Sequence, residues 1–150
     1  VYEQIDWPII VLIGAMIPVA NVLETSGTTS MMASTLIAMT ENFSPVLLLT
    51  ILLVLTMVLS DVMNNAATAV VMTPLCFACA QNLKLSPDPF LMAVAIGASC
   101  AFLTPIGHQN NLLIMGPGGY KFGDYWRMGL LLEILIVLVA VPMIVWIWPF

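Results

Sequence analysis

The stretch SDVMNNAAT at residues 60–68 decides the fold class, because it places polar side chains in the middle of an apolar run. Residues 45–59 before it and residues 69–80 after it are mainly apolar. A second polar stretch, TPIGHQNN at residues 104–111, interrupts in the same way the apolar run that starts at Pro89. Neutral polar groups where hydrocarbon is expected predict irregular backbone inside a membrane, which is tolerated where it is buried in protein or lines a cavity.

The low charge of the chain indicates the same surroundings. The 150 residues include three Lys and Arg and eight Asp and Glu, against 61% hydrophobic residues, whereas an average soluble domain is about 25% charged. So few charges cannot cover a soluble globule, and the high hydrophobicity excludes a disordered chain. The net charge of −5 argues against a nucleic-acid partner, because binding several phosphates needs many Lys and Arg. We therefore expect an all-α integral membrane protein in contact with the lipid bilayer.

The lengths of the apolar runs set the expected architecture, since a spanning helix needs about 20 apolar residues. Residues 45–80 are expected to form a re-entrant helix hairpin with its polar tip at membrane depth, because each apolar arm is short for a full span. Two full helices joined by an aqueous loop are the alternative. Residues 89–115 are predicted to form a broken helix that unwinds between Pro105 and Gly107. Residues 125–148 are predicted to form the last transmembrane helix, which is uninterrupted.

The last helix also indicates an orientation in the cell membrane. Tryptophans lie near both of its ends, which is typical of membrane interfaces. Lys121 and Arg127 flank its start, and basic residues mark cytoplasmic loops, so the C-terminus is expected outside. Glu133 lies about two turns into this helix, where it could face an aqueous cavity or a partner helix.

Two interrupted hydrophobic segments are the best sequence indication of a transporter site near the bilayer midplane. A helix that begins inside the membrane presents free N–H groups and the positive end of its dipole to an anion. A helix that ends there leaves carbonyl oxygens free to coordinate a small cation. The polar side chains available for such a site are Ser60, Asn64, Asn65 and Thr68 from the first stretch, and Thr104, His108, Gln109, Asn110 and Asn111 from the second.

Asp61 and His108 are open to more than one interpretation. An intramembrane carboxylate such as Asp61 is by default a cation ligand or proton carrier, but it could equally lie beside the tip as a helix cap. His108 is the only histidine, so this chain alone is not expected to form a metal cluster. Its imidazole could donate to an anion or shuttle a proton, or simply be packed. No paired carboxylates in one segment and no Ser/His/Asp order indicate hydrolysis, so an enzyme is not expected.

Both polar stretches resemble signatures of the divalent anion:sodium symporter family, within the wider ion transporter superfamily. SDVMNNAATA at residues 60–69 looks like that family's hairpin-tip motif, Ser-x-x-x-Ser-Asn-Thr-Ala-Thr-Ala. Residues 104–116 look like its second signature, on an unwound helix, and residues 116–125 are similar to its bacterial and algal permeases. The resemblance implies that these 150 residues are one transmembrane region, the C-terminal inverted repeat of a larger permease. It also implies a preceding N-terminal half and a homodimer.

Carried over by position, the resemblance puts a sodium and substrate site on the hairpin tip and on the unwound segment that faces it. Sodium is expected at Ser60, Asn64 and Asn65, as a coupling ion and with no other cofactor. The full predicted ion- and substrate-binding set is Ser60, Asn64, Asn65, Thr68, Gly107, His108 and Asn111, with Asp61 as a cation or proton carrier. Two departures favour sulfate or another small anion over a dicarboxylate, since Asn64 replaces the motif serine and Ala66 the motif threonine.

The predicted function is secondary active transport of a small anion, of the sulfate or dicarboxylate class, by alternating access. Sodium would order the tip and so raise the affinity for the anion, which is a reciprocal coupling. One alternative is a cation/proton antiporter of the same superfamily with Asp61 as carrier. Another is a membrane subunit that does not transport.

Overall fold

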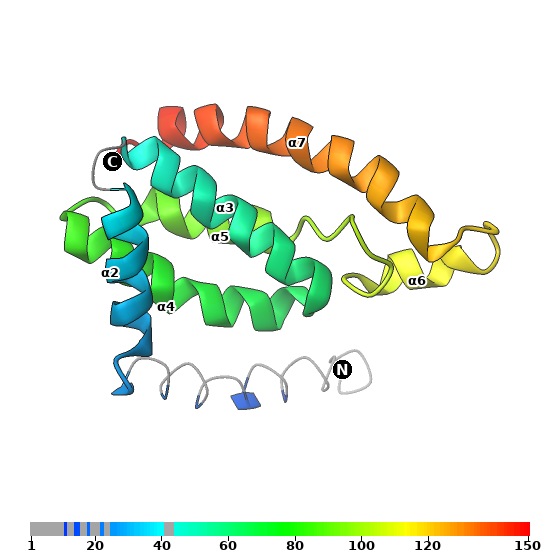
Figure 1. Ribbon diagram of the computed structural model, residues 1–150, viewed down its shortest axis with the longest axis horizontal. Helices are drawn as coiled ribbons and strands as arrows, with labels where there is room; N and C mark the ends of the chain where they lie inside the picture. The colour runs from blue at the N-terminus through cyan, green and yellow to red at the C-terminus, as the bar shows by residue number, and fades with distance from the viewer. Residues whose placement is uncertain (1–10, 12–13, 16–17, 19–21, 23–24, 41–43) are drawn as a thin grey trace, which may run out of the picture.

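The computed structural model describes residues 11, 14–15, 18, 22, 25–40 and 44–150, and in these residues the regular structure is entirely helical (Figure 1). Three of the helices are long and apolar enough to cross a membrane, namely α3, α4 and α7. The predicted class, an all-α membrane protein, is therefore confirmed. The elements in chain order are α2 (Thr28–Thr40), α3 (Pro45–Val62), α4 (Asn65–Leu83), α5 (Asp88–Ala98), α6 (Gln109–Met115) and α7 (Phe122–Ile147).

The hairpin of α3 and α4 has longer arms than the apolar runs suggest. α3 begins at Pro45, whose fixed φ and missing N–H suit the first helical turn. It continues through Ser60 and Asp61 before it ends, and α4 starts after an N-cap formed by Asn64. The arms are 18 and 19 residues long. Ser60 and Asp61 can be part of α3 because their side chains form hydrogen bonds with other segments of the fold.

The core lies where α3 packs on α5, with α4 on one side and α7 on the other (Figure 1). Leu49 of α3 and Phe90 of α5 are fully buried there. Gly97 allows the two helices to approach closely, since an added Cβ would lie 2.9 Å from Cβ of Thr56. Close approach at small residues is the usual way to pack helices in lipid, where apolar burial gives no preference for protein over hydrocarbon. α2 crosses the end of the hairpin that is remote from its tip (Figure 1).

The broken helix unwinds earlier than the sequence predicts. α5 ends at Ala98 and α6 begins at Gln109, so the irregular segment, called the break below, comprises residues 99–108. The helix can end early because the carbonyl of Ala98, which has no helical N–H to accept, accepts a hydrogen bond from the hydroxyl of Ser60 instead. The next helix starts early because His108 acts as its N-cap. The residues that follow His108 are therefore helical and not unwound.

α7 contains 26 residues and passes along the whole length of the hairpin (Figure 1). It begins a little before the predicted residue 125, because the carboxylate of Asp124 accepts a hydrogen bond from N–H of Lys121 at 2.8 Å and caps the first turn. Much of the helix is exposed, and a narrow stripe of it is buried against the rest of the fold. That stripe includes Gly129 and Glu133, which lie one turn apart.

Candidate functional site

The two polar stretches meet in space, although they are far apart in the sequence. The hairpin tip, residues 60–65, lies against the break. The hydroxyl of Ser60 donates to the carbonyl of Ala98 at 2.6 Å. The hydroxyl of Thr104 donates in the other direction, to the carbonyl of Asp61, also at 2.6 Å. The contact between tip and break is therefore formed by short hydrogen bonds to two backbone carbonyls near helix ends. Inside a continuous helix, these carbonyls would accept N–H groups of the following turn.

Asn65 lies at the centre of this contact. The amide atom that it points at the break is 3.1 Å from Oγ of Ser60, 3.1 Å from the carbonyl oxygen of Ala98 and 3.3 Å from that of Gly107. With its nitrogen turned to these three oxygens, the amide donates to them and closes the contact. With its oxygen turned to them, the amide accepts a hydrogen bond from the hydroxyl of Ser60 at 3.1 Å and faces the two carbonyl oxygens, a set of oxygen atoms that could hold a cation.

Gly107 is required by this close approach. It is buried, and an added Cβ would lie 2.7 Å from Cβ of Ala101 and 2.8 Å from the carbonyl oxygen of Ser60. The second distance is to rigid backbone, so a side chain here would push the break away from the tip. Gly107 therefore belongs to the site through its backbone and its lack of a side chain.

Thr104 holds both sides of the contact. Besides donating to the carbonyl of Asp61, its hydroxyl oxygen accepts the N–H of Gly107 at 3.2 Å. The side chain therefore bridges the tip and the last turn of the break. Among the described polar residues of the second stretch, Thr104 makes the shortest hydrogen bond to the tip.

The isosteric substitution Thr104→Val is expected to destabilise the protein by about 1–3 kcal/mol, because it leaves the carbonyl of Asp61 and the N–H of Gly107 without their partner. Thermal unfolding of the complete protein in detergent measures the loss. Thr73→Val, in which the lost hydroxyl bonds only to the carbonyl of Ala69 one turn back in α4, is the matched control and should unfold close to wild type. Equal melting of the two variants would contradict the bridging role of Thr104.

Asn64, His108 and Asn111 hold the backbone in shape. Oδ1 of Asn64 accepts the N–H of Ala67 at 2.8 Å, and Nδ1 of His108 accepts the N–H of Asn110 at 3.2 Å. Both are N-caps, of α4 and α6. The side chain of Asn64 is nevertheless exposed at the tip, where it can also reach a ligand.

Asn111 satisfies carbonyl groups of the break from α6. Its Nδ2 donates to the carbonyl of Ala101 at 2.9 Å and to that of Thr104 at 3.2 Å. The hydroxyl of Tyr125 donates to the carbonyl of Asn111 itself at 2.6 Å, which ties α6 to the start of α7. No sequence pattern predicted a site role for Tyr125, since a lone tyrosine near a helix end is also typical of an interfacial anchor.

Thr68 lies one turn further along α4 than Asn64, and its N–H donates to the carbonyl of Asn64 at 3.0 Å. It is fully buried, and its hydroxyl has no hydrogen-bond partner in the part of the chain that the structure describes. The structure thus brings Ser60, Asn65 and Gly107 together directly. Asn64, His108 and Asn111 surround them as supports.

Asp61 has its own environment, on the side of the tip that faces α7. Its Oδ1 accepts the N–H of Leu103 at 2.9 Å, so it binds the break and does not cap a helix. The carboxyl of Glu133 in α7 lies beside it, and both residues are buried. The sequence did not predict this pairing, because no local pattern links residues so far apart.

Comparisons with known proteins identify the family of the chain. The model of a family described as the citrate transporter matches residues 1–150. The chain belongs to the citrate transporter family. This confirms membership of a membrane transport family and the likeness to sodium-coupled anion symporters, and the family and these relatives are transporters and not enzymes.

Relatives of this citrate transporter family member are longer proteins. It is 38% identical over 149 residues to the uncharacterized transporter YfbS of Escherichia coli (strain K12), a match that covers 99% of this chain and 24% of that protein. It is 39% identical over 145 residues to the uncharacterized transporter sll0640 of Synechocystis, covering 97% of this chain and 24% of that protein. Sodium/sulfate cotransporter 2 of Chlamydomonas reinhardtii is 28% identical over 139 residues, 92% of this chain and 16% of its own length. The chain thus spans about a quarter of the first two relatives.

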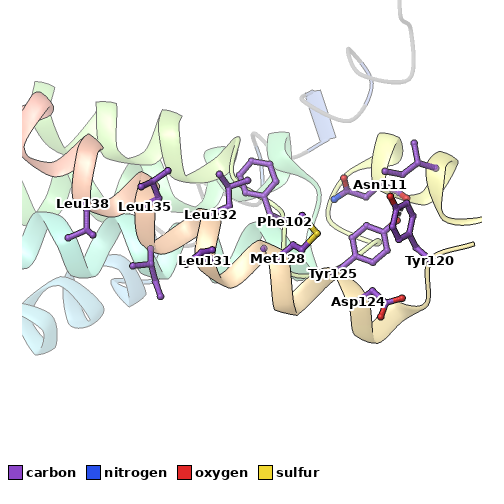
Figure 2. Close-up of a pocket in the computed structure, with 13 residues that line it drawn as sticks. Phe102, Asn111, Tyr120, Asp124, Tyr125, Met128, Leu131, Leu132, Leu135 and Leu138 are labelled. Atoms are coloured by element: carbon purple, nitrogen blue, oxygen red, sulfur yellow. Dashed lines mark hydrogen bonds between the residues drawn. The ribbon is translucent and has the colours of Figure 1, made fainter. Parts of the chain in front are cut away.

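An open hollow of about 730 Å³ in this family member lies beside the site, between the break, α6 and α7 (Figure 2). Leucines of α7, among them Leu131, Leu135 and Leu138, follow one another along it in Figure 2. Its other end is polar, where Asn111 and Tyr125 lie together (Figure 2). The hollow is mainly apolar, so it suits hydrocarbon or another helix better than a hydrated anion.

Proposed function

We propose that the chain forms part of a secondary transporter that moves a small anion together with sodium by alternating access. The observation that carries this proposal is the position of the Asn65 amide, which faces Oγ of Ser60 and the carbonyl oxygens of Ala98 and Gly107 within 3.3 Å. A half turn of the amide exchanges a closed hydrogen-bond cluster for four oxygen ligands. Neutral side-chain and carbonyl oxygens at interrupted helices are the ligands that sodium takes in transporters.

The anion would bind next to this cation, at the start of α4. α4 begins at the tip, so its first N–H groups and the positive end of its dipole lie beside the proposed sodium position. The exposed amide of Asn64 can donate to the anion there. Ala66 offers no hydroxyl, which favours an anion held mainly by backbone N–H groups, such as sulfate. The relatives support this class, because one of them is a sodium/sulfate cotransporter.

The proposal includes partners for the surfaces that this chain leaves open. The exposed leucines of α7 would face lipid and the remainder of a longer permease, which would supply the other half of the substrate site. A homodimer with the C-terminus outside the cell membrane completes the arrangement. The length of the relatives supports a longer permease, since YfbS and sll0640 are about four times as long as the segment that matches this chain.

Sodium is expected to raise the affinity of the complete protein for its anion by about 5- to 150-fold, the usual range of coupling between two sites. Uptake of radiolabelled sulfate and of radiolabelled succinate into proteoliposomes, in sodium and in potassium buffer, measures the effect and separates the two anion classes. Anion uptake that is equal in the two buffers would refute sodium coupling. Sodium efflux driven by a proton gradient, without anion uptake, would instead establish the antiporter.

A further inference from the structure

Hydrogen bonds run in series from the first turn of α7 to the hairpin tip. The hydroxyl of Tyr125 donates to the carbonyl of Asn111 at 2.6 Å. Nδ2 of Asn111 donates to the carbonyls of Ala101 and Thr104 in the break, at 2.9 Å and 3.2 Å. The hydroxyl of Thr104 then donates to the carbonyl of Asp61 at the tip, at 2.6 Å. Tyr125 is therefore linked to the proposed site, although it lies outside it.

α6, in the middle of this series, has little else to hold it. It is seven residues long, and an isolated helix of that length is not stable. Within the described part of the chain it packs against no other helix, and its side chains Leu112, Leu113 and Ile114 are exposed. Besides the chain at its two ends, two sets of hydrogen bonds hold α6 in place, those from Asn111 to the break and the one from Tyr125 of α7.

The ring of Tyr125 is itself held in one orientation. It meets the ring of Tyr120 edge to face, with centroids 6.2 Å apart and an interplanar angle of 65°, which is a favourable aromatic geometry. Gly118 makes room for this contact, since an added Cβ would lie 2.5 Å from the ring of Tyr120. Figure 2 shows both tyrosines at the polar end of the hollow, with Asn111 beside them. The hydroxyl of Tyr125 is thereby directed at one acceptor.

The oxygen that a shift of α6 would move most directly is the carbonyl oxygen of Gly107, one of the proposed sodium ligands. Gly107 comes directly before His108, the N-cap of α6, so a movement of the helix carries that carbonyl with it. The carbonyl of Ala98, before the other end of the break, is held separately by the hydroxyl of Ser60. The distance of 3.3 Å between the amide of Asn65 and the carbonyl oxygen of Gly107 therefore depends on the position of α6.

We infer that Tyr125 is a positioning residue, whose hydroxyl holds α6 and thereby sets the carbonyl of Gly107 against the hairpin tip. The inference rests on the proposed function for its effect on sodium. Without the hydroxyl, α6 shifts away for part of the time, and only the remaining fraction of the protein can bind sodium, so the apparent affinity falls. Once sodium is bound the site has its normal shape, and the maximum rate of uptake is kept.

Tyr125→Phe in the complete protein tests the inference, because it removes one oxygen atom and keeps the ring. The sodium concentration for half-maximal sulfate uptake should rise about tenfold, the effect of one lost hydrogen bond, with an unchanged maximum rate at saturating sodium. Tyr120→Phe is the matched control, since this tyrosine is half-exposed in the same hollow and its hydroxyl donates to no described residue. An unchanged half-saturating concentration in Tyr125→Phe, or an equal rise in Tyr120→Phe, overturns the inference.

A double-mutant cycle tests whether the bonds act in series. Asn111→Ala removes the two bonds from α6 to the break and should itself raise the half-saturating sodium concentration. The double variant with Tyr125→Phe should need about as much sodium as Asn111→Ala alone, because the tyrosine hydroxyl then holds a helix that no longer holds the break. Effects that multiply in the double variant would mean that Tyr125 acts by another route, and they overturn the inference.

Cysteine labelling measures the position of the break without any reference to transport. Cys100 lies in the break next to Ala101 and is 6% exposed, whereas Cys76 and Cys79 are fully buried in α4. In Tyr125→Phe, N-ethylmaleimide should modify Cys100 about tenfold faster than in wild type, because the break opens more often. Cys76 and Cys79 are internal controls, and their rates should stay unchanged.

The labelling separates the failure of this inference from the failure of the proposed function. If the complete protein shows no sodium-dependent uptake, the proposed function fails, and faster labelling of Cys100 alone still establishes Tyr125 as the residue that positions the break. A rate at Cys100 that is the same in Tyr125→Phe and in wild type overturns the inference. So does an equal increase at Cys76 and Cys79, which would show general loosening of the fold.

Discussion

Gly129→Ala is expected to unfold the junction between α7 and the break and to abolish transport. A Cβ at this position would overlap the carbonyl oxygen of Phe102 and lie 2.6 Å from its carbonyl carbon and 3.0 Å from N of Leu103. These are backbone atoms, so neither rotamer change nor side-chain motion relieves the contact. Overpacking in a rigid core costs about 1–3 kcal/mol and sometimes more, and we expect the upper end. α7 would have to move outward, taking Glu133 away from Asp61.

Gly123→Ala is the control for this variant. Gly123 lies in the first turn of the same helix, and nothing lies within 4 Å of its added Cβ. Since alanine is the better helix former by about 1 kcal/mol, Gly123→Ala should melt at or slightly above the wild-type temperature and transport normally. Thermal unfolding and anion uptake of both variants measure the contrast. Similar melting of Gly129→Ala and Gly123→Ala would show that α7 does not rest on the break at this point.

Asn65→Ala is expected to abolish sodium-coupled uptake while the protein still folds in the membrane. The change removes the donor that faces Ser60, Ala98 and Gly107, and with it one oxygen ligand of the proposed sodium site. A buried carbonyl left unpaired costs about 1–3 kcal/mol, which lowers the melting temperature but does not unfold the protein. Asn82→Ala, which truncates an exposed asparagine of the same helix, should leave uptake and melting unchanged.

Asn65→Asp separates ion binding from structural support. Aspartate keeps an oxygen ligand but has no hydrogen to donate to the facing carbonyl groups, so without sodium the contact is repulsive. We expect the variant to be less stable than wild type in potassium buffer and to gain more stability than wild type from added sodium, because ligand binding to the folded state stabilises it. A gain no larger than that of wild type would place sodium elsewhere in the protein.

Much of the fold follows from the sequence because the bilayer restricts backbone so strongly. Hydrogen-bonding groups have no water in hydrocarbon, so polar side chains at residues 60–68 and 104–111 are expected to find partners within the protein. Ser60 and Thr104 find theirs across the contact between the tip and the break. Ser60 and Asn65 could be singled out because small neutral side chains of this kind are rare in apolar runs. Gly107 could be singled out as a backbone position, although the groups that crowd it could not.

The rest of the site depends on groups that leave no mark in the sequence. The carbonyls of Ala98 and Ala101 are central acceptors, but an alanine in an apolar run gives no indication that its carbonyl accepts a hydrogen bond from a distant side chain. The early end of α5 follows from hydrogen bonds to those carbonyls, so the boundary of the break could not be read locally. Glu133 is similar, since its pairing with Asp61 depends on the register of α7, which Gly129 sets by contact and not by pattern.

The order of the segments along the chain has a consequence for biosynthesis. The hydroxyl that closes the carbonyl of Ala98 belongs to a residue 38 positions earlier, and chains fold from the N-terminus as they are made. The tip is therefore synthesised before the break, and the hydroxyl of Ser60 is already present when the carbonyl of Ala98 is made. The carbonyl of Asp61 shows the opposite order, because its donor, the hydroxyl of Thr104, is made 43 residues later.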